Sequence, residues 1–187
     1  MRNLLGGLVG ALVGAWLLVT LLALEPTSYP APFDSVWILL DGAAELQQVI
    51  RHILNSATVG AYLVSWLVVG IVTGLFSKSS WNAVRTSVWA GIVMFLLALT
   101  SNLVLDPLFW TSPNRNWDLV FLFASSIIIA GLSLPSSVPT VRIVNILQRG
   151  KTLPPPGKIQ TVCECGAVFK SRPLLCSNCG RRLAESK

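Results

Sequence analysis

Charge is scarce in this sequence, and this scarcity excludes an ordinary soluble domain. Only 12% of its 187 residues are Asp, Glu, Lys or Arg, whereas 53% are hydrophobic. A soluble domain would carry charge on about a quarter of its residues. The net charge of +6 would suggest a nucleic-acid partner in a soluble protein. Here the composition indicates a membrane protein, in which basic residues gather on one side of the bilayer.

Catalytic and ion-carrying groups are also few. His52 is the only histidine, and all 4 cysteines lie in the C-terminal tail. No long apolar segment carries a carboxylate, a basic residue or a histidine in its interior, as proton relays and ion-coupled transporters require. We find neither a nucleophile beside a base nor a glycine loop suited to phosphate. The sequence therefore predicts a protein that is neither an enzyme nor a self-sufficient pump.

Four apolar segments are long enough to cross a bilayer. An α-helix rises about 1.5 Å per residue, so about 20 residues cross a hydrocarbon core of about 30 Å. The first segment could be a secretory signal, but it is longer than a usual signal and lacks a small-x-small cleavage site. We therefore expect it to be retained, and we expect Pro135 to end the last segment. The predicted spans are residues 3–24, 57–76, 86–105 and 118–134.

Small residues recur inside these segments at the spacing of a helix face. Gly6, Gly10 and Gly14 lie four residues apart in the first segment, and Gly70 and Gly74 repeat this spacing in the second. Such strips allow two membrane helices to approach closely. We expect tight helix packing, within the chain or with another subunit.

Two groups of polar side chains need an explanation. Asn102 is the most polar side chain inside a predicted span, and a hydrogen bond to another helix is its ordinary use. Asp41, Glu45 and His52 share one side of a predicted helix, which is weak evidence for a metal site. A polar face turned to solvent is the favoured interpretation of these three residues.

Residues 34–55 and 136–150 are predicted to form amphipathic helices on opposite surfaces of the membrane. In the first, Asp34 is a candidate N-cap and Trp37 a candidate anchor in the interface. The second has its basic residues on one side, as suits an anionic membrane surface. Residues 151–160 are rich in proline and predict a stiff linker.

The distribution of Lys and Arg predicts the side of the membrane on which each loop lies. Of the 14 basic residues, only Arg51 and Arg115 would lie on one side, with all the others on the opposite side. The positive-inside rule therefore predicts an integral protein of the cell membrane with both termini in the cytoplasm.

The tail carries its cysteines in two close pairs, Cys163 with Cys165 and Cys176 with Cys179, and a glycine follows each pair. Four thiolates can close a tetrahedral shell around Zn²⁺. A segment this short cannot bury enough apolar surface to fold alone, so metal binding would have to supply the missing free energy. Two disulfides are the alternative in an oxidising compartment, and an iron or iron–sulfur site uses the same ligands.

These residues resemble the zinc-ribbon family, small modules built on two Cys-x-x-Cys-Gly turns. The second turn, Cys176-Ser-Asn-Cys179-Gly180, matches that pattern, whereas the first has one residue between its cysteines instead of two. The resemblance covers about the last eighth of the chain. It implies a zinc ribbon over residues 161–187, which the distribution of basic residues places in the cytoplasm.

The sequence thus predicts an all-α membrane protein, with four transmembrane helices, interfacial amphipathic helices and a small C-terminal zinc ribbon. Its expected parts are a four-span bundle (1–135), a cytoplasmic interfacial helix (136–150), a linker (151–160) and the ribbon (161–187).

The leading functional hypothesis is a non-enzymatic membrane scaffold or accessory subunit whose ribbon docks a partner. One alternative is a small oligomeric channel or permease regulated by the ribbon. Another is a membrane tether for nucleic acid or ribosomes, although basic residues beside a small module more often serve solubility and membrane attraction. Besides the lipid bilayer, the expected partner is a protein in a membrane complex or a second copy of the chain. The tether would use Lys170, Arg172, Arg181 and Arg182.

Overall fold

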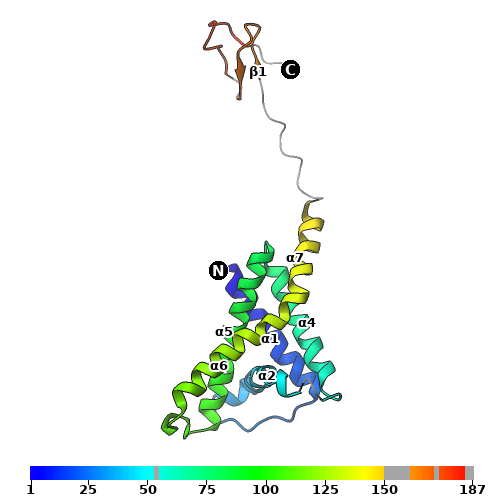
Figure 1. The fold of residues 1–187 in the computed structure, drawn as a ribbon, viewed down its shortest axis with the longest axis vertical. Coiled ribbons are helices and arrows are strands. Elements are labelled where there is room, and N and C mark those ends of the chain that lie inside the picture. The colour runs from blue at the N-terminus through cyan, green and yellow to red at the C-terminus, as the bar shows by residue number, and fades with distance from the viewer. Residues whose placement is uncertain (53–54, 150–160, 171–172, 184–187) are drawn as a thin grey trace. The chain divides into compact units, whose positions relative to one another are not determined.

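The structure is a computed structural model in which two compact units are distinguished, Met1–Gln148 and Arg149–Lys187. The first unit is helical, and the described strands belong to the second (Figure 1). The predicted linker, residues 151–160, lies outside the described part of the chain. The structure describes residues 1–52, 55–149, 161–170 and 173–183.

Four helical segments of the first unit are long and apolar enough to cross a membrane, as the sequence predicts. Three are single α-helices, and the fourth, residues 115–148, is made of two α-helices joined by a 3-10 turn. In chain order the helices are α1 (Arg2–Leu22), η1 (Phe33–Val36), α2 (Trp37–Gln47), α3 (Val49–His52), α4 (Val59–Phe76), α5 (Ser80–Leu105), η2 (Phe109–Thr111), α6 (Arg115–Ala130), η3 (Gly131–Ser133) and α7 (Leu134–Arg149).

Pro135 does not end the helical segment that contains the fourth predicted span. The helical segment continues through η3 into α7. Pro135 lies in the first turn of α7, where a missing N–H removes little α-helical hydrogen bonding. The proline therefore marks a change of helix type within the segment, not its end.

The first half of α7, which belongs to the predicted surface helix over residues 136–150, packs against α4. Ser137 is fully buried, and the Ser136 hydroxyl donates a hydrogen bond to the Leu67 carbonyl oxygen at 3.0 Å. A Cβ added to Gly74 would lie 2.8 Å from the Ser137 carbonyl oxygen. The face of α7 with small polar side chains thus packs on a glycine-containing helix and not against water.

The segment predicted as an outer amphipathic helix, residues 34–55, is inserted against the bundle. α2 contacts both α1 and α5, and Leu46 is fully buried there. A Cβ added to Gly42 would lie 2.6 Å from the carbonyl carbon of Ala15, so α1 and α2 touch through their backbones. Asp34, the expected N-cap, lies in η1 and makes no capping hydrogen bond.

The strip of small residues on α1 packs within the chain. A Cβ added to Gly7 would lie 2.6 Å from Cβ of Trp89 on α5. One added to Gly10 would lie 2.8 Å from Cγ2 of Thr73 on α4. Helices can approach this closely only where one of them has no side chain. The glycine spacing thus predicts tight helix contacts correctly.

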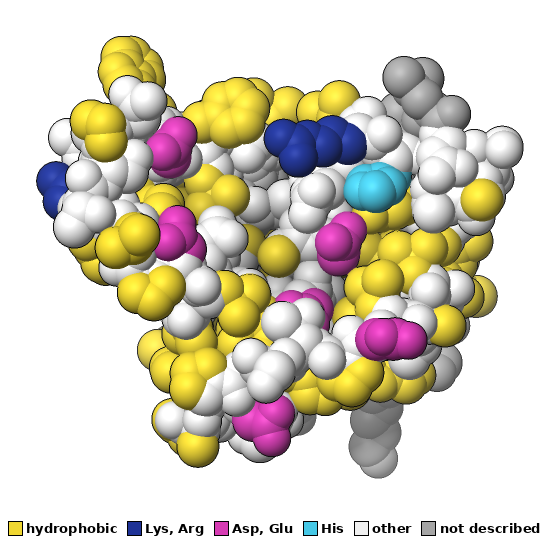
Figure 2. Space-filling view, turned by 90° about the horizontal axis from the view of Figure 1, so that it is seen from below, with side chains coloured by type: hydrophobic (Ala, Val, Ile, Leu, Met, Phe, Trp, Pro, Cys, Tyr) yellow, Lys and Arg dark blue, Asp and Glu magenta, His cyan; other side chains and the backbone are white. Residues whose placement is uncertain are grey.

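Charge is sorted between the two ends of the helical unit. Every Asp and Glu of this unit lies in α2, in the connecting segments or at the start of α6, and Figure 2 shows acidic side chains over this face. We call this the acidic end, although Arg51 and Arg115 also belong to it. Arg2, Lys78 and Arg85 lie at the other end of the helices, which we call the basic end. The acidic residues are Glu25, Asp34, Asp41, Glu45, Asp106 and Asp118.

Candidate metal centre

Two tight turns carry the four cysteines of the second unit, and we call residues 161–183 the cysteine module. The first turn joins strand β1 (Thr161–Val162) to the antiparallel strand β2 (Val168–Phe169). Within it, the Cys163 N–H donates to the Ala167 carbonyl at 2.9 Å, and the Gly166 N–H donates to the Cys163 carbonyl at 2.8 Å. Gly166 has a φ of +86°, which a side chain would disfavour.

The second turn repeats this arrangement with one more residue. The Cys176 N–H donates to the Arg181 carbonyl at 2.8 Å, and the Gly180 N–H donates to the Cys176 carbonyl at 2.8 Å. Gly180 again has a positive φ, +69°. In both turns a glycine closes the backbone onto the first cysteine of its pair. The shorter first pair is therefore accommodated by a tighter turn.

The four sulfur atoms gather in one cluster. The Sγ atoms of Cys163 and Cys179 lie 3.6 Å apart, as do those of Cys165 and Cys176, and all four lie within 4.8 Å of one another. A disulfide would need about 2.05 Å, so these are free thiols. Tetrahedral ligands at about 2.3 Å from a metal ion lie about 3.8 Å from one another. The cluster therefore has the spacing of a metal-binding shell.

Two of the thiols have pKa values shifted in opposite directions. Burial disfavours the Cys176 thiolate, but hydrogen bonds from the backbone of Cys179 and Asn178 outweigh burial and lower its pKa to about 6. At Cys163 a backbone hydrogen bond from Cys165 favours the thiolate, but burial and the neighbouring thiols raise its pKa to about 12. A bound cation would favour the thiolate form of all four.

The surface around the cluster is partly neutralised and partly apolar. The Arg181 guanidinium forms an ion pair with Glu164, which links the two turns. Arg172 lies outside the described residues. Lys170 and Arg182 are exposed, and neither forms an ion pair within the described part of the module. Both turns carry apolar side chains that are more than half exposed, namely Val162, Val168, Leu174 and Leu175.

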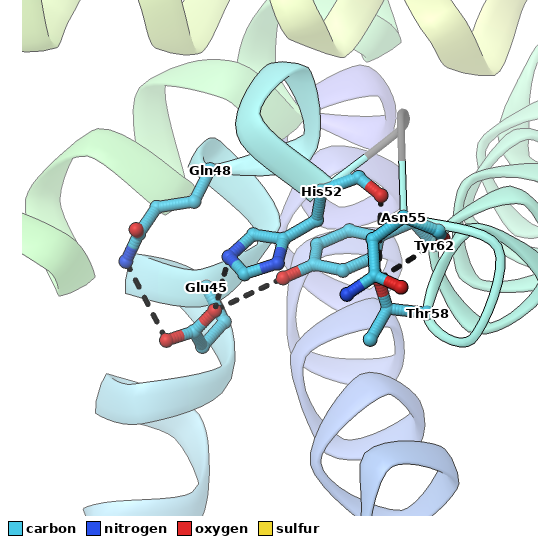
Figure 3. A network of polar contacts seen from close by, with 6 residues as sticks. All are labelled: Glu45, Gln48, His52, Asn55, Thr58 and Tyr62. Atoms are coloured by element: carbon cyan, nitrogen blue, oxygen red, sulfur yellow. Dashed lines mark hydrogen bonds and ion pairs between the residues drawn. The ribbon is translucent and has the colours of Figure 1, made fainter.

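The helical unit contains a polar network that the sequence does not predict (Figure 3). The Tyr62 hydroxyl donates to Glu45 Oε2 at 3.0 Å, and the His52 Nε2 atom lies 4.0 Å from the same oxygen. The His52 ring stacks on the Tyr62 ring, with centroids 5.3 Å apart. The Gln48 side chain donates to Glu45 Oε1 at 3.4 Å. The network connects α2, α3 and α4.

A second tyrosine bonds to the other carboxylate of α2. The Tyr29 hydroxyl donates to Asp41 and lies 2.8 Å from the hydroxyl of Ser101 on α5. Burial, with help from Asp41, raises the pKa of Tyr29 to about 12. The chain has 2 tyrosines, and both hold an α2 carboxylate.

These contacts correct the earlier interpretation of Asp41, Glu45 and His52. The two carboxylates bond to different tyrosines, so the polar face of α2 is not simply turned to solvent. The three side chains do not form a metal-binding group either, because within the described ranges only the cysteines gather closely enough. The tyrosines lie 12 and 17 residues from their partners along the sequence, a separation at which no sequence pattern predicts a contact.

Asn102 lines a cavity of about 430 Å³ at the acidic end, between α2, α3, α5 and α6. Gln47, Gln48 and Arg51 also line it. Among the residues that the structure describes, the Asn102 side chain forms no hydrogen bond to another helix, contrary to the prediction. Its polar side chain instead forms part of the cavity wall.

Comparison with known proteins does not add a relative to this geometry. No protein-family model, curated protein or solved structure matches the chain.

Proposed function

We propose that this protein is a non-enzymatic integral membrane scaffold or accessory subunit, with a C-terminal zinc ribbon that docks a partner protein. Both termini lie in the cytoplasm in this proposal, because the basic end of the bundle would face inward. The observation that carries it is the combination of four apolar helices packed through glycine with a separate cluster of four thiols.

Zinc is the metal that this cluster suits best. Four thiolates in a small module with glycine-closed turns are typical of structural zinc, and a reducing cytoplasm keeps thiols available. Iron is the competing metal because it accepts the same four ligands. Metal analysis of the purified protein should give one zinc ion per chain. Iron in its place, or no metal after purification without chelators, would refute the zinc assignment.

A protein partner fits the module better than nucleic acid does. Leu174 is 79% exposed and Val162 64% exposed, which is unusual for side chains of this size in an isolated module. The charge of Arg181 is already balanced by Glu164. Both features favour an apolar contact over a contact with phosphate groups.

The helical unit fits a scaffold better than a channel. The polar cavity beside Asn102 is the feature that favours a channel. However, α5 and α6 come together further along: a Cβ added to Gly91 would lie 2.9 Å from the Ser126 carbonyl oxygen and 3.1 Å from Cβ of Ala130. The cavity therefore has no direct continuation between these two helices.

Capture of the intact protein from solubilised membranes tests the docking role. We expect a partner to remain bound to wild type and to Ser177→Ala, a variant of an exposed residue between two ligands. The same partner should be lost from Cys176→Ser, which removes a ligand, and from Leu174→Glu, which charges the apolar surface. Recovery of the same proteins with all four forms would contradict docking through the module.

Flux measurements distinguish the scaffold from the channel. In liposomes, a scaffold should show no solute or ion flux that changes with Asn102→Leu, whereas Gly10→Leu should weaken assembly of the bundle. A channel predicts the opposite ranking. Flux that depends on Asn102 would contradict the scaffold proposal.

Labelling of engineered cysteines tests the topology. Ser35, which is exposed, and Ser112 both lie at the acidic end, which the proposal places outside the cell. Ser35→Cys and Ser112→Cys should react with an impermeant maleimide in intact cells, while the native cysteines stay unlabelled. Labelling of the native cysteines alone would show that the protein has the opposite orientation in the membrane.

A further inference from the structure

A groove of about 860 Å³ runs along the first turns of α1 and α5 at the basic end. Its walls are apolar, with Leu4 and Leu5 on α1 facing Val88 and Ile92 on α5. Leu5 is 50% exposed and Val88 36% exposed, so the groove opens to the surroundings of the helices.

The groove has the length of one leaflet of a bilayer. Its lining on α5 extends from Trp81 to Ile92, which corresponds to about 16 Å along a helix axis. Half of a hydrocarbon core of about 30 Å is about 15 Å. Behind the groove the two helices touch, since a Cβ added to Gly7 would lie 2.7 Å from the backbone nitrogen of Ala90. The groove is therefore an open slot for an extended chain and not a passage through the bundle.

A cation without a counter-ion stands at the mouth of this groove. The Arg85 guanidinium lies over the Trp81 ring, 5.7 Å from its centroid. Within the described part of the chain, no carboxylate pairs with Arg85, and the acidic residues of the helical unit lie at its other end. Arg2 and Lys78, both exposed, add positive charge at the same end.

From this arrangement we infer that the groove binds one anionic glycerophospholipid. One acyl chain lies between Leu4 and Val88, and the phosphate group bonds to Arg85. The apolar walls match an acyl chain, and the unpaired cation matches a headgroup with a net negative charge. An apolar protein segment would fill the walls but leave Arg85 without an anion. The inference rests on the membrane location that the proposed function also requires.

A second arginine–tryptophan pair provides a matched control. At the acidic end, the Arg115 guanidinium lies 5.4 Å from the centroid of the Trp110 ring. That arginine is already engaged, because it donates to the Trp110 carbonyl oxygen at 3.1 Å and to Asn116 at 3.4 Å. It does not line the apolar groove. Arg85→Gln and Arg115→Gln thus remove the same charge from the same kind of pair, but only the first removes it from the groove.

Native mass spectrometry of the full-length protein tests this inference. The protein would be reconstituted with equal amounts of dioleoyl phosphatidylglycerol and dioleoyl phosphatidylcholine, then released from detergent. We expect one phosphatidylglycerol to be retained per chain in preference to phosphatidylcholine. Arg85→Gln should weaken its retention about five-fold, the effect of roughly one basic residue at a membrane surface. Arg115→Gln should leave it unchanged.

Filling the groove tests the acyl-chain part separately. Val88→Trp should reduce retention while all charges remain, whereas Leu67→Trp, on an exposed site of α4 outside the groove, should not. Glycerol phosphate, which has the headgroup charge without acyl chains, should not compete. If Arg85→Gln fails to fold, Arg85→Lys keeps the charge and should retain the lipid, so Val88→Trp still tests the site.

Three results would overturn the inference: equal retention of the two lipids, equal loss in both arginine variants, or full competition by glycerol phosphate. Extraction of membranes with alkaline carbonate separates this failure from failure of the proposed function. A protein that resists extraction but prefers neither lipid lacks only the lipid site. A protein released by carbonate is not integral to the membrane.

Discussion

The helical unit and the cysteine module are stabilised in contrasting ways. In the helical unit, backbones approach one another where glycines remove side chains, and residues such as Leu46 and Tyr62 are almost completely buried. In the module, Val162, Val168, Leu174 and Leu175 stay exposed, and the buried residues include two of the clustered cysteines. One unit is therefore held by helix packing, whereas in the proposed function the other is held by a metal ion bound to its four cysteines. Changes that damage one unit should leave the other intact.

Removal of one sulfur ligand should have the largest effect. Cys176→Ser should abolish metal binding and unfold the module, because structural zinc supplies about 10–16 kcal/mol in small zinc-binding peptides. Limited proteolysis and metal content would report this loss, while thermal unfolding of the helical unit should not change. Ser177→Ala serves as the control and should keep the metal. A module that resists protease equally well in Cys176→Ser would show that sulfur ligands do not hold it.

Closing the tight gap between α1 and α2 should have the next largest effect, now on the other unit. Gly42→Ala places a Cβ against the backbone of Ala15, so α1 and α2 must separate, at a cost of about 1–3 kcal/mol in the free energy of unfolding. Thermal unfolding in detergent measures this, and the metal content should stay at the wild-type value. Gly60→Ala is the matched variant, because nothing lies within 4 Å of the added Cβ. A similar loss from both variants would contradict tight packing at Gly42.

Loss of a single hydrogen bond at Glu45 should have a smaller effect. Tyr62→Phe leaves a half-buried carboxylate without its best donor, which should lower the free energy of unfolding by about 1–2 kcal/mol. In a Glu45→Gln background the same change should cost less, since the donor no longer serves a charged acceptor. A double-mutant cycle measures the difference. Strictly additive effects would show that the two residues are not coupled.

Alkaline pH should also weaken the helical unit. The fold raises the pKa of Tyr29 from 10.0 to about 12, so it favours the protonated hydroxyl. This contribution is fully present below pH 10 and is lost as the pH rises through about 12. Comparing wild type with Tyr29→Phe across this interval isolates it, because the phenylalanine variant should lack this part of the pH dependence. Parallel curves for the two proteins would refute the Tyr29–Asp41 contact.

The long helices and the cysteine cluster could be predicted from the sequence because each depends on local information. An uninterrupted apolar run indicates where a membrane helix lies and how long it is. Glycine at every fourth residue indicates a helix face without side chains, on which another helix can pack closely. The pairing of Cys163 with Cys165 and of Cys176 with Cys179 places two thiols in each turn. The four thiols then form one cluster if the two turns lie next to each other.

The errors concern faces that are polar in sequence but packed in the structure. An amphipathic pattern predicts two different surfaces but does not say what covers the polar one. On α2 the covering groups are Tyr29 and Tyr62, which lie far from Asp41 and Glu45 along the sequence. On α7 the serines pack on the glycines of α4, and Pro135 is tolerated because it lies at a new first turn.

Hydrogen–deuterium exchange before and after metal removal tests the central claim most directly. Purified protein would be exchanged with its metal and again after treatment with a strong chelator. Independent stabilisation predicts that backbone amides of residues 161–183 lose protection, whereas those of residues 1–148 keep it. Loss of protection within the helices, or a module that stays protected without metal, would contradict the account.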